Sequence, residues 1–474
     1  MKSRWIVGLM LAAFVFSSST VMAAPGDKIV RTKSLTGLPI VQTACRILGC
    51  YVKTVLDAPP DQQTQPSSLF LVSGLLNNTV NLVLSLLGLA SIEEDSLVTI
   101  TENDSEGWGS NQATAAVLDQ ATAAVLDQLW NRTSMTYYGS PAWESYLTQP
   151  AAGIVGVRDA HCDQRATGGG LVAVIDTGVD VDHPTLAPAL VPGYNFVRDS
   201  SSADEKNDLS QATAAVLDGT NWVNGGTVAG LDQATAAVLD DPDHAAFGHG
   251  TMVAGMIRLT APKAKIMPVK AFSANGTANT SDVLRAIYYS VNKGAKVINM
   301  SFSRPTSSLE LKIALDYAAA RGVIAVASAG NEGTSQLRYP AAYDNVIGVA
   351  ATTNNDVRSS YSSYGSKLVS YAAPGDWLIT TYPFGTFAAT SGTSFSAPIV
   401  AGGAALLVGI QGNASPSQVS SALSHAKYLG TDLGKGRVKL VDAVAAGRAM
   451  WPWGASSTVP ASCGAGDVDW TEAP

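Results

Sequence analysis

After residue 150 the chain contains five runs of mostly apolar residues, each about as long as one strand. Nearly continuous apolar runs are typical of strands buried on both faces of a parallel sheet. Amphipathic segments separate several of them, and two of these segments end at Gly294 and Gly322, as helices often do. This alternation predicts an α/β fold with a doubly wound, mostly parallel sheet flanked by helices. The runs are LVAVI (171–175), KIMPVKAF (265–272), AKVINMSF (295–302), GVIAVAS (322–328) and NVIGVAA (345–351).

Length and charge narrow the class of protein further. The 474 residues are enough for two or three domains and a large core. Charged residues make up only 14% of the chain, which suits a compact secreted protein better than a cytosolic scaffold. The net charge of −8 gives no electrostatic reason to bind nucleic acid or an anionic membrane, so neither is expected as a partner.

Residues 1–23 have the layout of a secretory signal peptide. Lys2 and Arg4 precede an apolar run over 5–16, and small residues follow up to Ala23. No later stretch reaches about 18 uninterrupted apolar residues, so no membrane span is expected. The sequence therefore predicts a secreted protein, either extracellular or periplasmic.

Residues 24–105 show a different pattern and predict a separate, small α+β unit. Short strands are expected over 50–56, 68–75 and 96–100, and a helix running into a turn is expected over 79–95.

The four cysteines allow disulfides in an exported protein. The favoured pairs are Cys45 with Cys50 and Cys162 with Cys463, because each pair then lies within one expected folding unit. The other pairings and free thiols stay open.

The octapeptide QATAAVLD occurs four times at irregular intervals, and each copy is too short to be the unit of a repeat fold. We interpret the copies as duplicated sequence in surface loops, which tolerate insertion, with a specific binding role as the alternative. Residues 106–149 are interpreted as a linker that holds two copies, and residues 451–474 as an irregular tail. The copies occupy 112–119, 120–127, 211–218 and 233–240.

Three short motifs carry candidate chemical groups where strands end or helices begin. Asp176 ends the strand in VAVIDTGVD, His249 lies between two glycines in FGHGTMVAGMI, and Ser394 opens a helix in GTSFSAP. Taken singly, each residue has a structural explanation, as a turn aspartate, a hydrogen-bonded histidine or a helix-capping serine. In open α/β sheets, however, functional groups gather beyond the carboxyl ends of the strands.

Together these residue types meet the demands of nucleophilic acyl transfer. A serine hydroxyl is a weak nucleophile until a neutral imidazole removes its proton, and a carboxylate orients that imidazole. A helix N-terminus at Ser394 places backbone N–H groups where negative charge develops. Asn331, in VASAGNEG, offers a second hydrogen-bond donor for that charge, and a buried structural asparagine is the alternative.

With these motifs, residues 150–450 resemble the subtilisin-like serine proteases, whose Asp, His, Ser order the chain shares. The resemblance implies that Asp176 is the orienting carboxylate, His249 the general base and Ser394 the nucleophile. It also implies an oxyanion hole formed by Asn331 and the Ser394 backbone N–H. The expected catalytic domain spans 150–450 and hydrolyses peptide bonds in polypeptide substrates.

The resemblance extends to segments that would bind the substrate. VINMSFS resembles the strand edge that pairs with an extended peptide, ASAGNEG one wall of the specificity pocket, and LRYPAAY its far wall. We hypothesise that Arg338 points into this pocket and favours an acidic or small residue before the scissile bond, the alternative being an arginine turned to solvent. The expected substrate-binding residues are Ser301, Phe302, Ser303, Ser328, Ala329, Gly330 and Arg338.

By size and position, residues 24–105 resemble the inhibitory propeptide of this family. A zymogen is then expected, which cuts itself between about 105 and 150 and has its own propeptide as intramolecular inhibitor. A separate binding module is the alternative, and a monomer is expected. The sequence predicts no required cofactor. Calcium as a structural ion stays open, because the acidic loop over 199–208, expected to be solvated, and DDPDH (240–244) lack an ordered ligand spacing.

A catalytically silent binding protein on the same fold is the second hypothesis, from a different functional class. Every residue that the chemistry needs is present, which favours the enzyme. An aspartic protease is excluded, because the single Asp-Thr-Gly has no second counterpart in the sequence.

Overall fold

The structure is a computed structural model, which describes residues 27–32, 38–48, 50–57, 68–73, 89–100, 132–162, 166–209 and 242–451. The chain divides into two compact units, one within residues 1–55 and 66–95 and the other comprising residues 56–65 and 96–474. The expected signal peptide, all four octapeptide copies and the tail after residue 451 lie outside the described residues.

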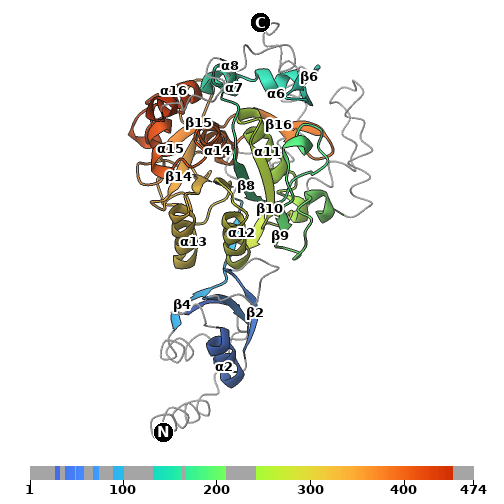
Figure 1. Cartoon of the computed structure of the whole chain (residues 1–474), viewed down its shortest axis with the longest axis vertical. Coiled ribbons are helices and arrows are strands. Elements are labelled where there is room, and N and C mark those ends of the chain that lie inside the picture. The colour runs from blue at the N-terminus through green and yellow to red at the C-terminus, as the bar shows by residue number, and fades with distance from the viewer. Residues whose placement is uncertain are drawn as a thin grey trace. The chain divides into compact units, whose positions relative to one another are not determined.

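In its described residues, the smaller unit is an antiparallel sheet of four strands with helix α2 (Leu38–Leu48) against strand β2 (Figure 1). The order of the strands is β2-β3-β1-β4, and β1 pairs with both β3 and β4. Cys45 and Cys50 form the first of the two expected disulfides. Cys162 is also disulfide-bonded, and its expected partner Cys463 lies outside the described residues. The strands are β1 (Lys28–Thr32), β2 (Tyr51–Val55), β3 (Leu69–Ser73) and β4 (Leu89–Glu94).

Two expectations for this region need correction. The helix expected over 79–95 is wrong at its end, because Leu89–Glu94 is strand β4, paired with β1. A short apolar run does not distinguish helix from strand, and here the sheet edge supplies the backbone partners. The strand expected over 96–100 forms as β5 (Leu97–Thr99), but it pairs with β11 (Thr277–Asn279) within the larger unit.

The larger unit is built on a parallel sheet of seven strands in the order β15-β14-β13-β12-β8-β10-β9. All five predicted runs are strands of this sheet, so the predicted α/β architecture is confirmed. The sequence did not predict β9 (Tyr194–Asn195) or β15 (Tyr371–Pro374), which are short and lie at the two edges. The predicted strands are β8 (Leu171–Asp176), β10 (Lys265–Lys270), β12 (Val297–Met300), β13 (Ile324–Ser328) and β14 (Val346–Thr352).

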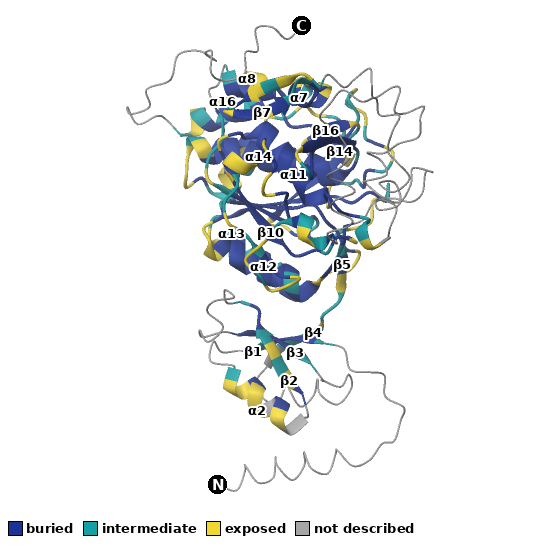
Figure 2. Ribbon diagram, turned by 90° about the vertical axis from the view of Figure 1, so that its right-hand side faces the viewer, coloured by how far each residue is buried: buried dark blue, intermediate teal, exposed yellow. Residues whose placement is uncertain are grey.

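Four helices cover the sheet (Figures 1 and 2). Helices α11 (His249–Thr260) and α14 (Thr393–Ile410) pack against each other on one face, and α12 (Thr280–Asn292) and α13 (Leu309–Ala320) lie on the other. Every residue of α11 is buried. By length and composition α14 could cross a membrane, but 89% of it is buried inside the unit, as expected of a core helix.

Shorter elements complete the larger unit around this core. They are β6 (Ser134–Tyr137), β7 (Ser140–Trp143), α6 (Glu144–Thr148), α7 (Pro150–Val155), α8 (Val157–Cys162), η2 (Ala187–Ala189), η3 (Glu205–Asp208), η5 (Pro242–His244), β16 (Leu378–Tyr382), β17 (Thr386–Thr390), α15 (Pro416–Leu423), η6 (Thr431–Leu433) and α16 (Leu440–Met450).

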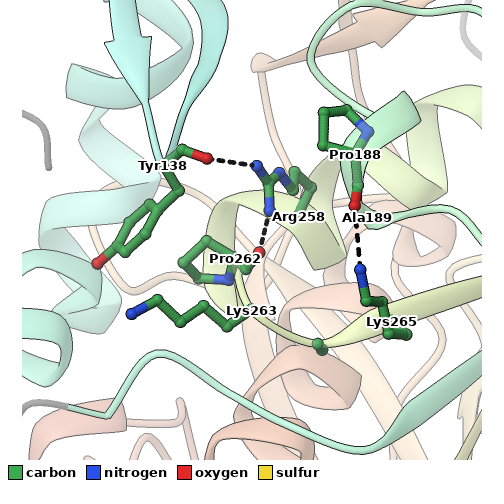
Figure 3. Close-up of a pocket in the computed structure, with 8 residues that line it drawn as sticks. Tyr138, Pro188, Ala189, Arg258, Pro262, Lys263 and Lys265 are labelled. Carbon is green, nitrogen blue, oxygen red and sulfur yellow. Dashed lines mark hydrogen bonds between the residues drawn. The ribbon is translucent and has the colours of Figure 1, made fainter. Parts of the chain in front are cut away.

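Arg258, near the end of α11, is a buried cation held by neutral oxygens (Figure 3). Its guanidinium donates to Thr185 O at 3.2 Å, to Tyr138 O at 3.4 Å and to Pro262 O. It borders a cavity of about 280 Å³ whose lining contains no carboxylate and none of the predicted site residues, so backbone dipoles stabilise the charge. The cavity is lined by Tyr138, Pro188, Ala189, Arg258, Pro262, Lys263, Ala264 and Lys265.

His161, in α8, is buried, and its Nε2 lies 2.8 Å from Thr260 O. Burial disfavours the charged imidazolium and lowers the pKa of His161 to about 4, although the bond to Thr260 acts in the opposite direction.

We therefore expect His161 to make the fold sensitive to acid. Its unfolded-state pKa is near ~6.5, so below that pH the unfolded chain binds more protons and stability falls as the pH approaches 4, by roughly 2–3 kcal/mol. His161→Gln keeps a donor for Thr260 O but does not titrate. In urea unfolding at several pH values, its free energy of unfolding should decline less between pH 6.5 and 4 than that of the wild type. Equal declines in the two proteins would refute the prediction.

Candidate active site

Asp176 lies at the carboxyl end of β8, which runs between β12 and β10 in the interior of the sheet. Its side chain is buried. One carboxylate oxygen, Oδ1, accepts hydrogen bonds from Thr177 N at 2.8 Å and from His249 Nδ1 at 2.6 Å. The strand therefore fixes the carboxylate, and the carboxylate fixes the imidazole.

His249 is the first residue of α11 and is fully buried. The glycine after it allows the helix to start close to the loop that follows β8. A Cβ on Gly250 would lie 1.9 Å from Gly178 O, a distance that no side chain tolerates. The Gly-His-Gly motif thus brings the imidazole within hydrogen-bonding distance of Asp176.

Ser394 is the second residue of α14 and is also buried. Pro398, four residues later, has no N–H, so the Ser394 carbonyl lacks its ordinary helical donor. That carbonyl accepts the Ser301 hydroxyl at 2.7 Å instead, and the Ser394 hydroxyl donates to Ser301 O at 3.3 Å. The proline therefore allows the segment after β12 to anchor Ser394.

The structure brings the three predicted residues together at the carboxyl edge of the sheet. The centroids of the His249 and Phe395 rings are 5.4 Å apart, and Phe395 is the neighbour of Ser394 in α14. His249 Nε2 has no hydrogen-bond partner among the described residues. The Ser394 hydroxyl is directed to Ser301 O and forms no hydrogen bond with His249 Nε2.

Asn331 follows β13 and faces the start of α14. Its Oδ1 accepts hydrogen bonds from Thr393 N at 2.9 Å and Thr393 Oγ1 at 2.8 Å, which fixes the orientation of the amide. A Cβ on Gly392 would lie 3.4 Å from Asn331 Nδ2, so Gly392 borders the nitrogen side of the amide. Ser394 lies in the first turn of α14, where backbone N–H groups have no acceptor within the helix.

The predicted substrate-binding segments lie beside these groups. Residues 301–303 follow β12, and Ser301 bonds Ser394 as described. Residues 328–330 begin with the last residue of β13, and Gly330 N donates to Thr393 Oγ1 at 3.2 Å. All six residues of these two segments are buried.

Arg338 is paired with Glu332, for which no motif in the sequence predicted a role. Its Nη2 lies 3.1 Å from Glu332 Oε1, and the two side chains are 15% and 22% exposed. Both border Gly330, where an added Cβ would lie 2.5 Å from Glu332 Oε2 and 3.3 Å from Arg338 Cγ. The ion pair therefore covers one end of the segment 328–330.

The acidic loop over 199–208 is not the fully solvated loop that its composition predicted. Glu205 is completely buried and accepts hydrogen bonds from Thr177 Oγ1 at 3.0 Å and Gly248 N at 3.1 Å. Asp208 lies 2.6 Å from Lys270 Nζ, which is buried in β10. No local signal marks these residues, because their partners are distant in sequence.

The carboxylates in and near this loop are not arranged to bind calcium. Lys206 Nζ lies 2.7 Å from Asp180 Oδ1, 2.9 Å from Asp182 Oδ2 and 4.0 Å from Asp204 Oδ2. An ammonium group thus occupies the space between three carboxylates. Within the described parts of the chain, no group of three or more His, Cys, Asp or Glu side chains could hold a metal ion.

Comparison with known proteins places this site in context. A model of the subtilase family (Peptidase S8) matches residues 167–447, a range that contains Asp176, His249, Asn331 and Ser394. Thermitase of Thermoactinomyces vulgaris is 38% identical over 280 residues, which cover 58% of this chain and 88% of thermitase. Subtilisin DY of Bacillus licheniformis is 35% identical over 257 residues, 53% of this chain and 81% of that protein. Among solved structures, the crystal structure of a lanthipeptide protease matches with a TM-score of 0.51 and 25% identity, over 63% of this chain and 94% of that one.

Proposed function

Because the chain belongs to the subtilase family and is a subtilisin-like serine endopeptidase, we propose that it cleaves polypeptides through an acyl-enzyme on Ser394. In this reaction Ser394 Oγ attacks the peptide carbonyl while its proton passes to His249, and Asp176 holds the resulting imidazolium. The oxyanion accepts hydrogen bonds from the Asn331 amide and the Ser394 backbone N–H. His249 then protonates the leaving amine, and water hydrolyses the ester by the same route.

The buried hydrogen bond of 2.6 Å between Asp176 and His249 is the observation that carries this proposal. A carboxylate that is shielded from water and bonded to Nδ1 leaves the other ring nitrogen as the base. The helix start at Ser394 supplies donors for the charge that forms in the transition state.

A fluorophosphonate probe should label the mature wild-type protein and should not label Ser394→Ala, because only an activated serine attacks the phosphorus. His249→Ala should also lose nearly all labelling. Ser391→Ala removes a nearby hydroxyl that bonds Trp377 N, so it is the matched control and should label like the wild type. Peptide mass spectrometry locates the adduct. A folded wild type that takes up no probe would favour the silent binding protein.

We also propose that residues 301–303 and 328–330 form the substrate edge and pocket wall, and that Arg338 restricts the pocket to small residues. The hypothesis from sequence allowed an acidic or a small residue before the scissile bond. Since Glu332 already neutralises the guanidinium at 3.1 Å, an acidic side chain gains little there, which favours the small residue.

Cleavage of a peptide library should therefore show a preference for alanine, serine or threonine before the scissile bond. Glu332→Gln leaves the guanidinium without its counter-charge and should raise cleavage after acidic residues by about tenfold. Arg338→Gly should admit larger side chains. A preference for large aromatic residues that is identical in wild type and Arg338→Gly would rule the proposal out.

The interactions of β5 support the proposal that residues 24–105 include an intramolecular inhibitor. Val98 lies opposite Ala278 in the antiparallel pairing of β5 with β11. On the other side of β5, Thr99 pairs with Ser303, whose N–H donates to Thr99 O at 3.3 Å. An extended segment held by main-chain bonds between two strands is bound as a peptide substrate is bound.

The register of this pairing suggests where the chain cuts itself. In an antiparallel pair, a step forward on one strand matches a step back on the other. Thr99 faces Ser303, and Ser301, two residues before Ser303, carries the carbonyl that accepts the Ser394 hydroxyl. We therefore propose cleavage after residue 101, before the 105–150 interval expected from the sequence. Residues 101 and 102 themselves lie outside the described residues.

The mature wild-type enzyme should begin at Glu102, and Ser394→Ala should keep this bond intact. The exported, uncleaved form of Ser394→Ala should then begin after residue 23, which also tests the proposed signal peptide. N-terminal sequencing and intact mass determine both ends. A mature N-terminus beyond residue 105 would show that the register does not set the cleavage site, and cleavage in purified Ser394→Ala would assign it to another protease.

A further inference from the structure

A second buried carboxylate, Glu205, lies behind the Asp176–His249 pair. Its side chain is completely shielded from solvent. Oε2 accepts from Thr177 Oγ1 at 3.0 Å and Gly248 N at 3.1 Å, while Oε1 accepts from Thr251 N at 3.3 Å and from the Thr251 hydroxyl. All of these donors belong to the two segments that carry Asp176 and His249.

The Thr177 hydroxyl lies between the two carboxylates. Its oxygen is 3.3 Å from Asp176 Oδ1 and 3.0 Å from Glu205 Oε2, and it accepts the Gly250 N–H at 3.0 Å. A hydroxyl has one hydrogen to donate, so it can serve only one carboxylate at a time. The protonation state of Glu205 decides which one.

A change in the protonation of Glu205 redirects the hydrogen of the Thr177 hydroxyl. When Glu205 is ionised, both of its oxygens accept, and the Thr177 hydrogen is directed to the nearer acceptor, Glu205 Oε2. When a proton from solvent binds Oε2, Glu205 donates to Thr177 Oγ1, which still accepts from Gly250. The Thr177 hydrogen then turns to Asp176 Oδ1, the oxygen that holds His249.

We propose that Glu205 is a positioning residue that controls, through the Thr177 hydroxyl, how strongly Asp176 stabilises the charged form of His249. The proposal rests on the function proposed above. Protonated Glu205 gives Asp176 Oδ1 a third donor besides Thr177 N and His249, which spreads the charge of the carboxylate. Ionised Glu205 leaves that charge to His249. Turnover is therefore faster when Glu205 is ionised.

The surroundings of Glu205 make both states accessible. Burial raises the pKa of the Glu205 carboxyl well above its usual range, and the charge of Asp176 adds to this effect. Hydrogen bonds from Thr251 and Thr177 and the charge of Lys270 act in the opposite direction. The titratable groups that act on Glu205 include Asp176 of β8, Lys270 of β10 and Tyr382 of β16, and Lys270 is itself paired with Asp208.

The test compares kcat/KM against pH for wild type, Thr177→Val and the matched control Thr177→Ser. In the wild type we expect kcat/KM to rise with pH in two steps, the second of about tenfold. Thr177→Ser keeps the hydroxyl and should keep both steps. Thr177→Val and Glu205→Gln should each show one step. Thr177→Val should reach the kcat of the ionised state and Glu205→Gln only that of the protonated state, with KM unchanged. A purely structural role would lower activity equally at every pH, and a second step that persists in Thr177→Val would overturn the proposal, as would a single step in the wild type.

Two further measurements separate this inference from the proposed function. The NMR resonance of the His249 Nδ1 proton should shift across the second step in wild type and Thr177→Ser but stay constant in Thr177→Val, even if Glu205→Gln does not fold. Fluorophosphonate labelling of the same samples reports on Ser394 directly. Normal labelling with unchanged pH profiles would refute only the role of Glu205, whereas a wild type without labelling would refute the proposed function.

Discussion

The hydrogen bond between Asp176 and His249 connects an interior strand of the sheet to helix α11, and the site depends on how closely that helix can approach. Gly250 permits the approach, because any side chain there would collide with Gly178 O. Helix α11 then packs against α14, where a Cβ on Gly402 would lie 2.5 Å from Thr260 Cβ. Strand β8 and helices α11 and α14 therefore pack too closely to shift relative to one another. This keeps the imidazole and Ser394 at the same edge of the sheet.

Buried charges around this core are satisfied by fixed groups of the protein. The Arg258 guanidinium is bound by backbone carbonyls, and Lys270 contacts Thr177 O, Phe272 O and Asp208. Glu205 receives its hydrogen bonds from the loop after β8 and from the start of α11. Because an unsatisfied buried charge is very costly, these bonds oppose movement of the segments that carry the site.

The edge occupied by β5 links inhibition to specificity in the proposed zymogen. Main-chain hydrogen bonds hold β5, so under the proposed function an extended substrate would compete for the same place. Its side chains alternate between the two sides of the strand, with Val98 fully buried and Leu97 64% exposed. The contacts that would retain the propeptide are therefore those that would select a substrate.

Local pattern determined much of this molecule. The apolar runs predicted five strands of the sheet, and glycine, aspartate, histidine and serine at strand ends and helix starts marked Asp176, His249, Asn331 and Ser394, because strand ends and helix starts impose local requirements on residue type. Only the tertiary structure decided that Leu89–Glu94 is a strand, that β5 pairs with β11, that Glu205 is buried and that Glu332 neutralises Arg338. Each of these depends on a partner brought near by the packing of the whole fold. The hydrophobic periodicity of a single segment does not identify that partner.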